Sequence, residues 1–213
     1  MNRIIYLHGF ASSPASSKAR FFAQYLRDRG AIVDIPDLAA GDFENLTLTS
    51  QLDVIERAAA GQPVSRPVSL IGSSMGGYLA ALYAQRHPEV ARLVLLAPAF
   101  CFARRWAERL GAKALAEWRD TGTMNVFHYG DNCTRKLAYT LLEDARQFPD
   151  YPDVRQPAMI FHGEHDDIVP PQFSVEFAAA HPNASFEILD SGHELINVLD
   201  YMAPKVAGFL GAN

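Results

Sequence analysis

The chain has 213 residues, of which 49% are hydrophobic and 20% charged, and its mean hydropathy is -0.04. These values are typical of a single globular domain spanning residues 1–213, and they exclude a disordered, collagenous or membrane-embedded chain. The formal net charge of -5 provides no basic field for phosphates, so we expect no nucleic acid partner.

Short apolar runs alternate with segments of helical spacing along the chain. Runs that are apolar throughout, such as Leu93-Val94-Leu95-Leu96, are typical of strands covered on both faces. The alternation predicts an α/β fold with a doubly wound, mostly parallel sheet of about six strands. We expect strands at residues 3–8, 31–35, 68–71, 93–96, 158–161 and 185–189. We expect helices at residues 16–29, 50–60 (closed by Gly61), 75–87, 171–180 and 193–210.

The stretch from about residue 98 to residue 156 interrupts this alternation. It is rich in aromatic side chains and contains no clear strand. A loop of that length without secondary structure is improbable in a compact domain. We therefore expect a mostly helical insertion that forms a cap or lid over one end of the sheet. Its aromatic residues are Phe100, Phe102, Trp106, Trp118, Phe127, Tyr129, Tyr139, Phe148 and Tyr151.

A glycine-flanked serine follows the strand expected at 68–71. The segment Gly72-Ser73-Ser74-Met75-Gly76-Gly77 satisfies G-x-S-x-G with Ser74 at its centre. In this motif the serine occupies a sharp strand-to-helix turn, where glycines avoid a steric clash. The Ser74 hydroxyl is a candidate nucleophile, the Met75 backbone N–H is a candidate oxyanion donor, and Ser73 is expected to be structural. The alternative is a plain turn or a phosphate-binding loop, although G-x-G-x-x-G spacing is absent.

A serine nucleophile needs a histidine base and a carboxylate that fixes the tautomer of that base. Among the seven histidines, we favour His193, because Asp190-Ser191-Gly192-His193 follows the last expected strand. Its loop would lie at the carboxyl ends of the strands, where open α/β sheets bind ligands. The carboxylate is expected after the preceding strand, in His162-Gly163-Glu164-His165-Asp166-Asp167. The candidates are Asp166, Asp167 and Glu164, with Asp190 as a more remote one.

His162 and His165, beside two aspartates, also have to be considered as metal ligands. Their H-x-x-H spacing lacks both the helical H-E-x-x-H pattern and the remaining ligands of a catalytic zinc, so no metal is expected. Cys101 and Cys133 are far apart and in no C-x-x-C pair. This spacing predicts neither a disulfide framework nor a zinc site, and we expect two buried or half-buried thiols.

The first apolar run of the sequence is short. Four apolar residues, Ile4 to Leu7, precede His8-Gly9, whereas a signal peptide has an apolar region of roughly 7 to 15 residues. No apolar run approaches the roughly 18 residues needed to span a bilayer. We therefore expect no membrane span and a cytoplasmic location.

Taken together, these motifs resemble the α/β-hydrolase superfamily. The resemblance rests on Tyr6-Leu7-His8-Gly9-Phe10, the serine turn at 72–77, the acid turn at 163–170 and Ser191-Gly192-His193, in the order Ser, Asp, His. The longer N-terminal match, Tyr6 to Pro14 followed by Ser17-Lys18-Ala19, is similar to the YqiA-like small bacterial serine esterases. The stretch 98–156 has no counterpart in the match.

The resemblance assigns roles to individual residues. It implies that Asp166 is the acid and that the Phe10 backbone N–H joins that of Met75 in an oxyanion hole. It also implies that His8 and Gly9 support this loop, beside the turn glycines Gly72 and Gly76. The first strand here would correspond to the third strand of the full superfamily sheet.

These residues predict a cofactor-free serine esterase acting on a small-molecule ester or thioester. The aromatic insertion favours a small to medium, largely apolar substrate. Arg104 and Arg105 are either an anion site or, in the favoured interpretation, a solvated helix face. A peptidase, a lactonase or a cofactor-free haloperoxidase would use the same triad, and a non-catalytic binding protein would keep the fold without turnover. Nothing in the sequence specifies an oligomeric state.

Overall fold

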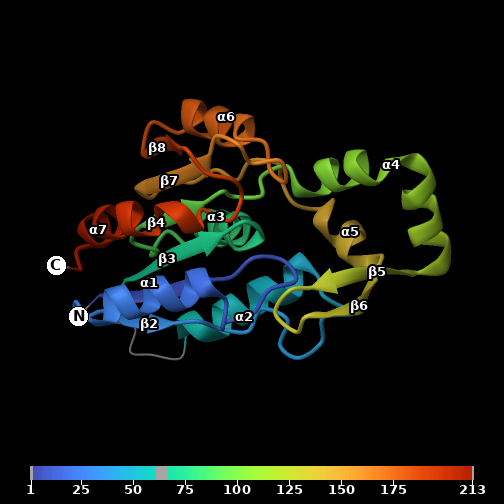
Figure 1. Cartoon of the computed structure of the whole chain (residues 1–213), viewed down its shortest axis with the longest axis horizontal. Helices are drawn as coiled ribbons and strands as arrows, with labels where there is room; N and C mark the ends of the chain where they lie inside the picture. Colours follow the sequence, from blue (N-terminus) through green and yellow to red (C-terminus); the bar gives the residue numbers. More distant parts are fainter. Residues whose placement is uncertain (1, 61–66, 213) are drawn as a thin grey trace.

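The computed structural model describes residues 2–60 and 67–212, which form a central parallel sheet with helices on both faces (Figure 1). In this part of the chain, six strands follow the order β2-β1-β3-β4-β7-β8, and every neighbouring pair is parallel. This order confirms the predicted doubly wound α/β fold. The strands are β1 (Arg3–Leu7), β2 (Ile32–Asp34), β3 (Val68–Ser73), β4 (Leu93–Leu96), β7 (Ala158–Gly163) and β8 (Ala184–Leu189).

Two sets of helices cover the two faces of the sheet, and each set closes its own apolar core. α1 (Ser17–Arg27) and α7 (Leu199–Leu210) pack on one face. α2 (Leu48–Ala60), α3 (Met75–Arg86) and α6 (Gln172–Ala180) pack on the other. Every residue of α3 from Met75 to Ala84 is buried, as is expected of a helix that is apolar all round. α3 is therefore held in place by packing along most of its length.

Helix boundaries differ from the sequence prediction by one or two residues, except at the last helix, where the difference is larger. The helix expected at 193–210 begins at Leu199, after a short 3-10 turn over Ile196–Val198. Leu195 has a left-handed backbone (φ 55°), which interrupts any helical path from His193. His193 therefore lies in a loop. The helix expected at 50–60 begins earlier, at Leu48, and its expected closure at Gly61 lies outside the described residues.

The insertion (residues 98–156) contains a β-hairpin, so the expectation that it has no strand is wrong. α4 (Phe102–Thr121) leads into β5 (Thr123–His128), which pairs antiparallel with β6 (Cys133–Ala138), and α5 (Thr140–Ala145) follows. The hairpin and α4 stand to one side of the sheet (Figure 1). β6 is mostly exposed and β5 is only partly buried, so neither strand carries the strong apolar pattern by which a strand is recognised in a sequence.

The two cysteines occupy different environments. Cys101 is buried at the start of α4, as expected. Cys133 is exposed, which contradicts the expectation of a buried or half-buried thiol. It is the first residue of β6, beside the hairpin turn, and the first four residues of this strand are all exposed.

The tip of the hairpin is bonded to the loop that follows β1. The Tyr129 and Gly130 N–H groups donate to the Ala11 carbonyl, with N···O distances of 2.8 and 3.3 Å. A Cβ at Gly130 would lie 2.9 Å from the Ser13 Cβ, so the two backbones are in close contact. The segment Ala11–Ser13 thus serves as the docking site of the hairpin.

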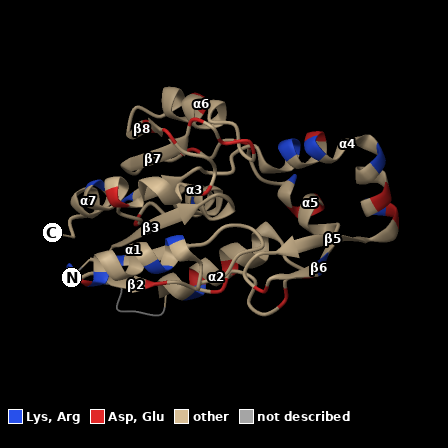
Figure 2. Cartoon of the chain, viewed as in Figure 1, with Lys and Arg blue, Asp and Glu red and all other residues tan. Residues whose placement is uncertain are grey.

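Charges are mixed along the outer elements. Lys and Arg alternate with Asp and Glu on α4, so this helix carries no continuous basic strip (Figure 2). Within residues 2–60 and 67–212, no helix combines the length and the apolar character that a bilayer crossing requires.

Gly76 is the position at which a side chain is least tolerable. A Cβ there would lie 2.1 Å from the Leu7 carbonyl oxygen and 2.6 Å from that of His8. Gly76→Ala is therefore expected to lower the free energy of unfolding by about 3 kcal/mol or more, because backbone has to move. Urea denaturation measures the change.

Gly208 in α7 is the matched control, because an added Cβ meets no atom within 4 Å. Gly208→Ala is expected to raise the free energy of unfolding by up to about 1 kcal/mol, since alanine favours the helix. Equal stability of the two variants would contradict the close contact at Gly76.

Candidate active site

Ser74 lies in a strained turn between β3 and α3. Its backbone has φ 54° and ψ -118°, a conformation that costs about 1–3 kcal/mol in a non-glycine residue. Four backbone hydrogen bonds hold it there. The Ser74 N–H donates to Leu96 O at 2.9 Å, and the Ser74 carbonyl accepts from Gly77 and Ala99, each at 2.9 Å, and from Tyr78 at 3.2 Å. The side chain is consequently presented at the carboxyl edge of the sheet, as the G-x-S-x-G motif predicts.

The glycines around Ser74 are required by close contact. A Cβ at Gly72 would lie 2.2 Å from the Gly76 carbonyl oxygen, which is a clash of backbone with side chain. Ser73, the neighbouring serine, is buried at the end of β3 and makes no hydrogen bond with a histidine in the part of the chain that the structure describes. The structure thus separates the roles of the two serines.

His193 contacts the Ser74 hydroxyl. The loop that follows β8 brings the His193 Nε2 atom to 3.0 Å from the Ser74 Oγ atom. This loop approaches the end of β7 so closely that a Cβ at Gly163 would lie 2.4 Å from the Gly192 carbonyl oxygen. Asn197 holds the loop by accepting from the Ser191 hydroxyl at 2.6 Å. The imidazole is therefore placed by a tightly packed turn.

Asp166 completes the chain of contacts. Its Oδ2 atom lies 2.7 Å from the His193 Nδ1 atom, and its side chain has no solvent exposure. The Ile168 and Val169 N–H groups donate to its Oδ1 atom at 2.9 and 2.7 Å. His162 Nε2 lies 3.1 Å from the same Oδ2 atom. A carboxylate with this many donors is strongly held in one orientation.

The same contacts govern the ionisation of Asp166. Burial alone would raise the pKa of this carboxyl group, but the hydrogen bonds from His162, His193 and Val169 outweigh burial. The pKa of Asp166 therefore lies well below its ordinary value. Burial lowers the pKa of the Lys18 ammonium to about 8. The negative charge of Asp166 acts in the opposite direction and raises the pKa of both Lys18 and Arg105. These two cations favour the ionised carboxylate.

The other candidate acids do not reach His193. Glu164 and Asp167 are exposed, and Asp190 is exposed and pairs with His165 at 2.9 Å. Among the described residues, Asp166 is the only carboxylate that is hydrogen-bonded to the His193 ring. Asp166, which the resemblance implied as the acid, is thus the carboxylate that lies next to His193.

His8 lies beside the site without joining it. Its Nε2 atom accepts from the Leu38 N–H at 3.2 Å, so its Nδ1 carries the proton and faces the Gly9 carbonyl at 3.0 Å. Burial is the main cause that lowers the pKa of this histidine, which keeps it neutral. The side chain thereby ties the end of β1 to the loop after β2, which is a supporting position.

Two backbone N–H groups next to Ser74 are free. Neither Phe10 nor Met75 donates its N–H to an acceptor within the described residues. A Cβ at Gly9 would lie 3.4 Å from the Ser74 Cβ, which shows that the loop carrying Phe10 packs against the serine. Met75 is the first residue of α3, where unpaired N–H groups point out of the helix.

The structure shows where the residues considered as metal or anion ligands lie. His162 faces inward to Asp166, whereas His165 lies at the surface, so the H-x-x-H pair does not converge. Across residues 2–60 and 67–212, no group of three His, Cys, Asp or Glu side chains is arranged to hold a metal ion. Arg104 pairs with Asp150 at 3.2 Å, and Arg105 donates to the Ile168 carbonyl. Both guanidinium groups are thus engaged within the protein.

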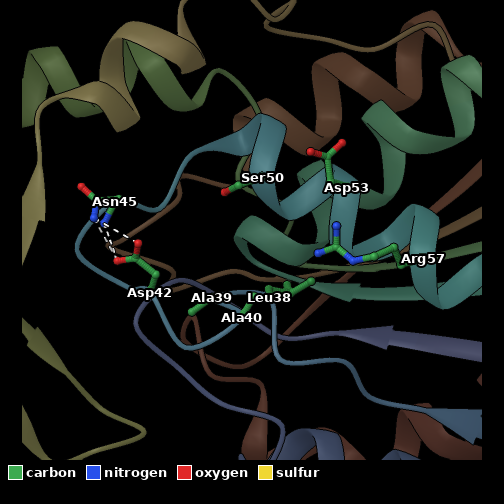
Figure 3. Close-up of a pocket in the computed structure, with 8 residues that line it drawn as sticks. All are labelled: Leu38, Ala39, Ala40, Asp42, Asn45, Ser50, Asp53 and Arg57. Carbon is green, nitrogen blue, oxygen red and sulfur yellow. Dashed lines mark hydrogen bonds between the residues drawn. The ribbon is translucent and has the colours of Figure 1, made fainter.

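A separate pocket of about 190 Å³ lies beside α2, away from Ser74. Figure 3 shows Asp42 and Asn45 hydrogen-bonded to each other on its rim, with Asp53 and Arg57 on the helix opposite. Its lining includes none of the residues in the Ser74 site and mixes both charge signs. Its residues are Leu38, Ala39, Ala40, Asp42, Asn45, Ser50, Asp53 and Arg57.

Sequence reasoning missed one part of the site. His162 was considered only as a metal ligand, and Ser174, which lies 2.7 Å from its Nδ1 atom, was not considered at all. Both side chains are fully buried. A histidine inside an otherwise apolar strand, close in sequence to the candidate acid, was the available signal for His162.

Comparison with known proteins assigns the family. Residues 3–210 match the Uncharacterised protein family UPF0227. The chain belongs to this family. A search of curated proteins found no match to the UPF0227 chain.

Solved structures show the fold of this UPF0227 member. Alpha/beta hydrolase domain-containing protein 10 from mouse is 20% identical, with a TM-score of 0.82 over 98% of this chain and 89% of that chain. Est1E from Butyrivibrio proteoclasticus, solved with ferulic acid bound, is 21% identical, with a TM-score of 0.82 over 99% and 88%. Monoacylglycerol lipase from Paleococcus ferrophilus is 15% identical, with a TM-score of 0.71 over 99% and 95%. The predicted α/β-hydrolase resemblance is confirmed at the level of fold.

The depressed pKa of Asp166 predicts how stability depends on pH. Wild type is expected to be more stable than Asp166→Asn at neutral pH, because folding favours the ionised carboxylate. For a carboxyl group whose pKa is lower in the folded state, this advantage is present above about pH 4 and is lost as the pH falls further. Urea denaturation between about pH 3 and pH 7 measures the difference.

Asp167→Asn is the matched control, because Asp167 is exposed and adjacent. Its stability is expected to stay within about 0.5 kcal/mol of wild type. An advantage of wild type over Asp166→Asn that grows on acidification would contradict the prediction.

Proposed function

We propose that this chain is a cofactor-free serine hydrolase that cleaves a carboxylic ester or thioester of a small to medium, largely apolar substrate. One observation carries the proposal: Ser74 Oγ, His193 and Asp166 form a continuous hydrogen-bonded series, with distances of 3.0 and 2.7 Å. This is the arrangement of nucleophile, base and orienting acid that acyl transfer needs. A cytoplasmic location is part of the proposal.

The first step forms an acyl-enzyme. His193 Nε2 takes the proton of the Ser74 hydroxyl as Oγ bonds to the substrate carbonyl carbon. The carbonyl oxygen becomes negative and accepts hydrogen bonds from the Phe10 and Met75 N–H groups. Collapse of this intermediate breaks the bond to the leaving alcohol or thiol, which receives the proton from His193. Asp166 remains ionised and stabilises the imidazolium throughout, in keeping with its lowered pKa.

The second step releases the acid. His193 takes a proton from water, whose oxygen attacks the acyl carbon, and the same N–H groups hold the oxygen again. The bond to Ser74 Oγ then breaks, and the proton on His193 returns to the serine. The cycle consumes one water and needs no redox partner or metal.

Aromatic side chains around Phe10 support an apolar substrate. The Phe10 ring packs against Trp106 of α4 and Phe43, with ring centroids 5.2 and 5.5 Å apart. Trp106 also contacts Phe102, at 5.3 Å. Because the Phe10 backbone is the proposed oxyanion donor, this aromatic cluster lies next to the reacting carbonyl. We infer that the insertion caps the site and forms the acyl pocket.

The similar structures favour ester chemistry over the alternatives. One binds ferulic acid, and another is named a monoacylglycerol lipase. A peptidase, lactonase or haloperoxidase would use the same three residues, and no feature of the described residues favours any of them. A binding protein without turnover has no need for the aligned hydroxyl, imidazole and carboxylate.

The nucleophile is tested by a fluorophosphonate probe with intact mass and peptide mapping. We expect one adduct on Ser74, because only a hydroxyl activated by a base reacts with the probe. EDTA should have no effect. Ser74→Ala should lose the adduct and lower kcat/KM for an ester by about 10⁴-fold or more.

Ser73→Ala is the control for the neighbouring serine and should label normally. A wild-type protein that takes up no adduct and cleaves no ester would overturn the proposed function and favour a binding protein.

The acyl pocket is tested by replacing Trp106. Trp106→Ala removes an apolar wall beside Phe10, so kcat/KM should fall by about tenfold or more for long or aromatic acyl groups. Acetyl esters, which do not reach the wall, should change by less than about threefold. p-Nitrophenyl esters of graded acyl length measure the effect.

Tyr129→Ala removes an aromatic side chain from the same insertion at a site that is 76% exposed, and it should alter neither class of ester. Equal losses for short and long esters in Trp106→Ala would place Trp106 in packing rather than in specificity.

A further inference from the structure

A second histidine contacts the carboxylate of the proposed triad. His162 Nε2 lies 3.1 Å from Asp166 Oδ2, the same oxygen that His193 Nδ1 approaches at 2.7 Å. His162 comes from β7, and neither its side chain nor that of Asp166 has any solvent exposure. The reaction steps described above make no use of this contact.

The neighbours of His162 fix where its proton lies. Two acceptors surround Nε2, namely Asp166 Oδ2 at 3.1 Å and the Val169 carbonyl oxygen at 2.8 Å. Neither can donate, so Nε2 carries a hydrogen and donates to both. The other nitrogen, Nδ1, faces the Ser174 hydroxyl at 2.7 Å.

Ser174 determines the charge of the ring. Its hydroxyl, at the start of α6, has no other side-chain hydrogen-bond partner within the described residues. A buried hydroxyl needs an acceptor for its hydrogen, and His162 Nδ1 supplies one only if it is unprotonated. The geometry thus favours the neutral tautomer with hydrogen on Nε2. A neutral donor holds the carboxylate in place without cancelling its negative charge.

We propose that His162, oriented by Ser174, is a positioning residue that holds Asp166 in line with His193. The proposal rests on the proposed serine hydrolase function. His162 has no hydrogen bond to Ser74 or His193 and no access to substrate from its buried position, so it acts only through Asp166. It connects the acid to α6, because Ser174 lies on that helix.

The tautomer of His162 is measurable in the wild-type protein, with no substrate. Nitrogen-15 NMR of the histidine rings in the folded protein should show a neutral His162 with hydrogen on Nε2, as its hydrogen-bond partners require. Hydrogen on Nδ1, or a doubly protonated ring, would overturn the proposal.

Substitutions test the effect on catalysis. His162→Leu removes the donor and should lower kcat by about 10- to 100-fold, the usual worth of a hydrogen bond to a charged group. KM should stay within about twofold, because His162 does not touch substrate. His162→Gln places an amide N–H near the position of Nε2 and should bring kcat back to within about threefold of wild type.

His181→Gln is the matched control, because His181 is also buried, at the end of α6, and its ring contacts Phe177 rather than the Ser74 site. Its Nδ1 atom faces the Phe177 carbonyl at 2.8 Å, and its ring stacks on the Phe177 ring. The His181→Gln variant should leave kcat unchanged. The proposal is wrong if His162→Leu keeps a kcat within about twofold of this control, or if His162→Gln is no better than His162→Leu.

Ser174→Ala keeps the test decisive if His162→Leu does not fold. It should lower kcat at least about threefold and shift the low-field proton signal of His193 Nδ1, which reports the bond to Asp166. No change in either measurement would overturn the role of Ser174 and His162. A wild-type protein without ester turnover or fluorophosphonate labelling would instead count against the proposed function, while the NMR measurements would still decide whether His162 holds Asp166.

Discussion

The contact on which the rest of the structure depends is the approach of the first turn of α3 to the end of β1. Only a residue without a side chain fits at Gly76, where the Leu7 carbonyl would be 2.1 Å from a Cβ, and the same is true of Gly72. This contact lies directly beside Ser74, whose backbone has a positive φ at the end of β3. Steric exclusion and backbone hydrogen bonds therefore place the Ser74 residue, and its own side chain has no part in placing it.

The acid is placed by a different kind of interaction. Asp166 is a buried negative charge, and such a charge is tolerated only when donors surround it. Backbone N–H groups take one oxygen, while two histidines take the other. The imidazole of His193 is then the link between a sterically fixed hydroxyl and an electrostatically fixed carboxylate. A shift of the Asp166 carboxylate would therefore change the position of the His193 ring and, through it, the hydrogen bond to Ser74.

Local patterns predicted the sheet, Ser74, His193 and the segment that carries the acid, because glycine spacing and apolar runs are local in sequence. Other features depend on contacts between distant segments. The hairpin over 123–138 has one mostly exposed and one partly buried strand and thus a weak apolar pattern. It is held by the Trp118 indole N–H, which donates to the Leu137 carbonyl at 2.9 Å. Ser174 contacts His162 only because α6 packs beside β7 in the folded chain. The choice of Asp166 over Asp167 needed family resemblance, because adjacent aspartates have the same local pattern.

The bonds between the hairpin tip and the Ala11 carbonyl join the insertion to the loop after β1. Ala11 directly follows Phe10, so the peptide that anchors the hairpin is next to the peptide that would hold the negative oxygen under the proposed function. A displacement of the hairpin would therefore be passed to the Phe10 N–H through a single residue. On that proposal, the fit of an acyl group against the insertion and the alignment of the oxyanion donor would depend on each other.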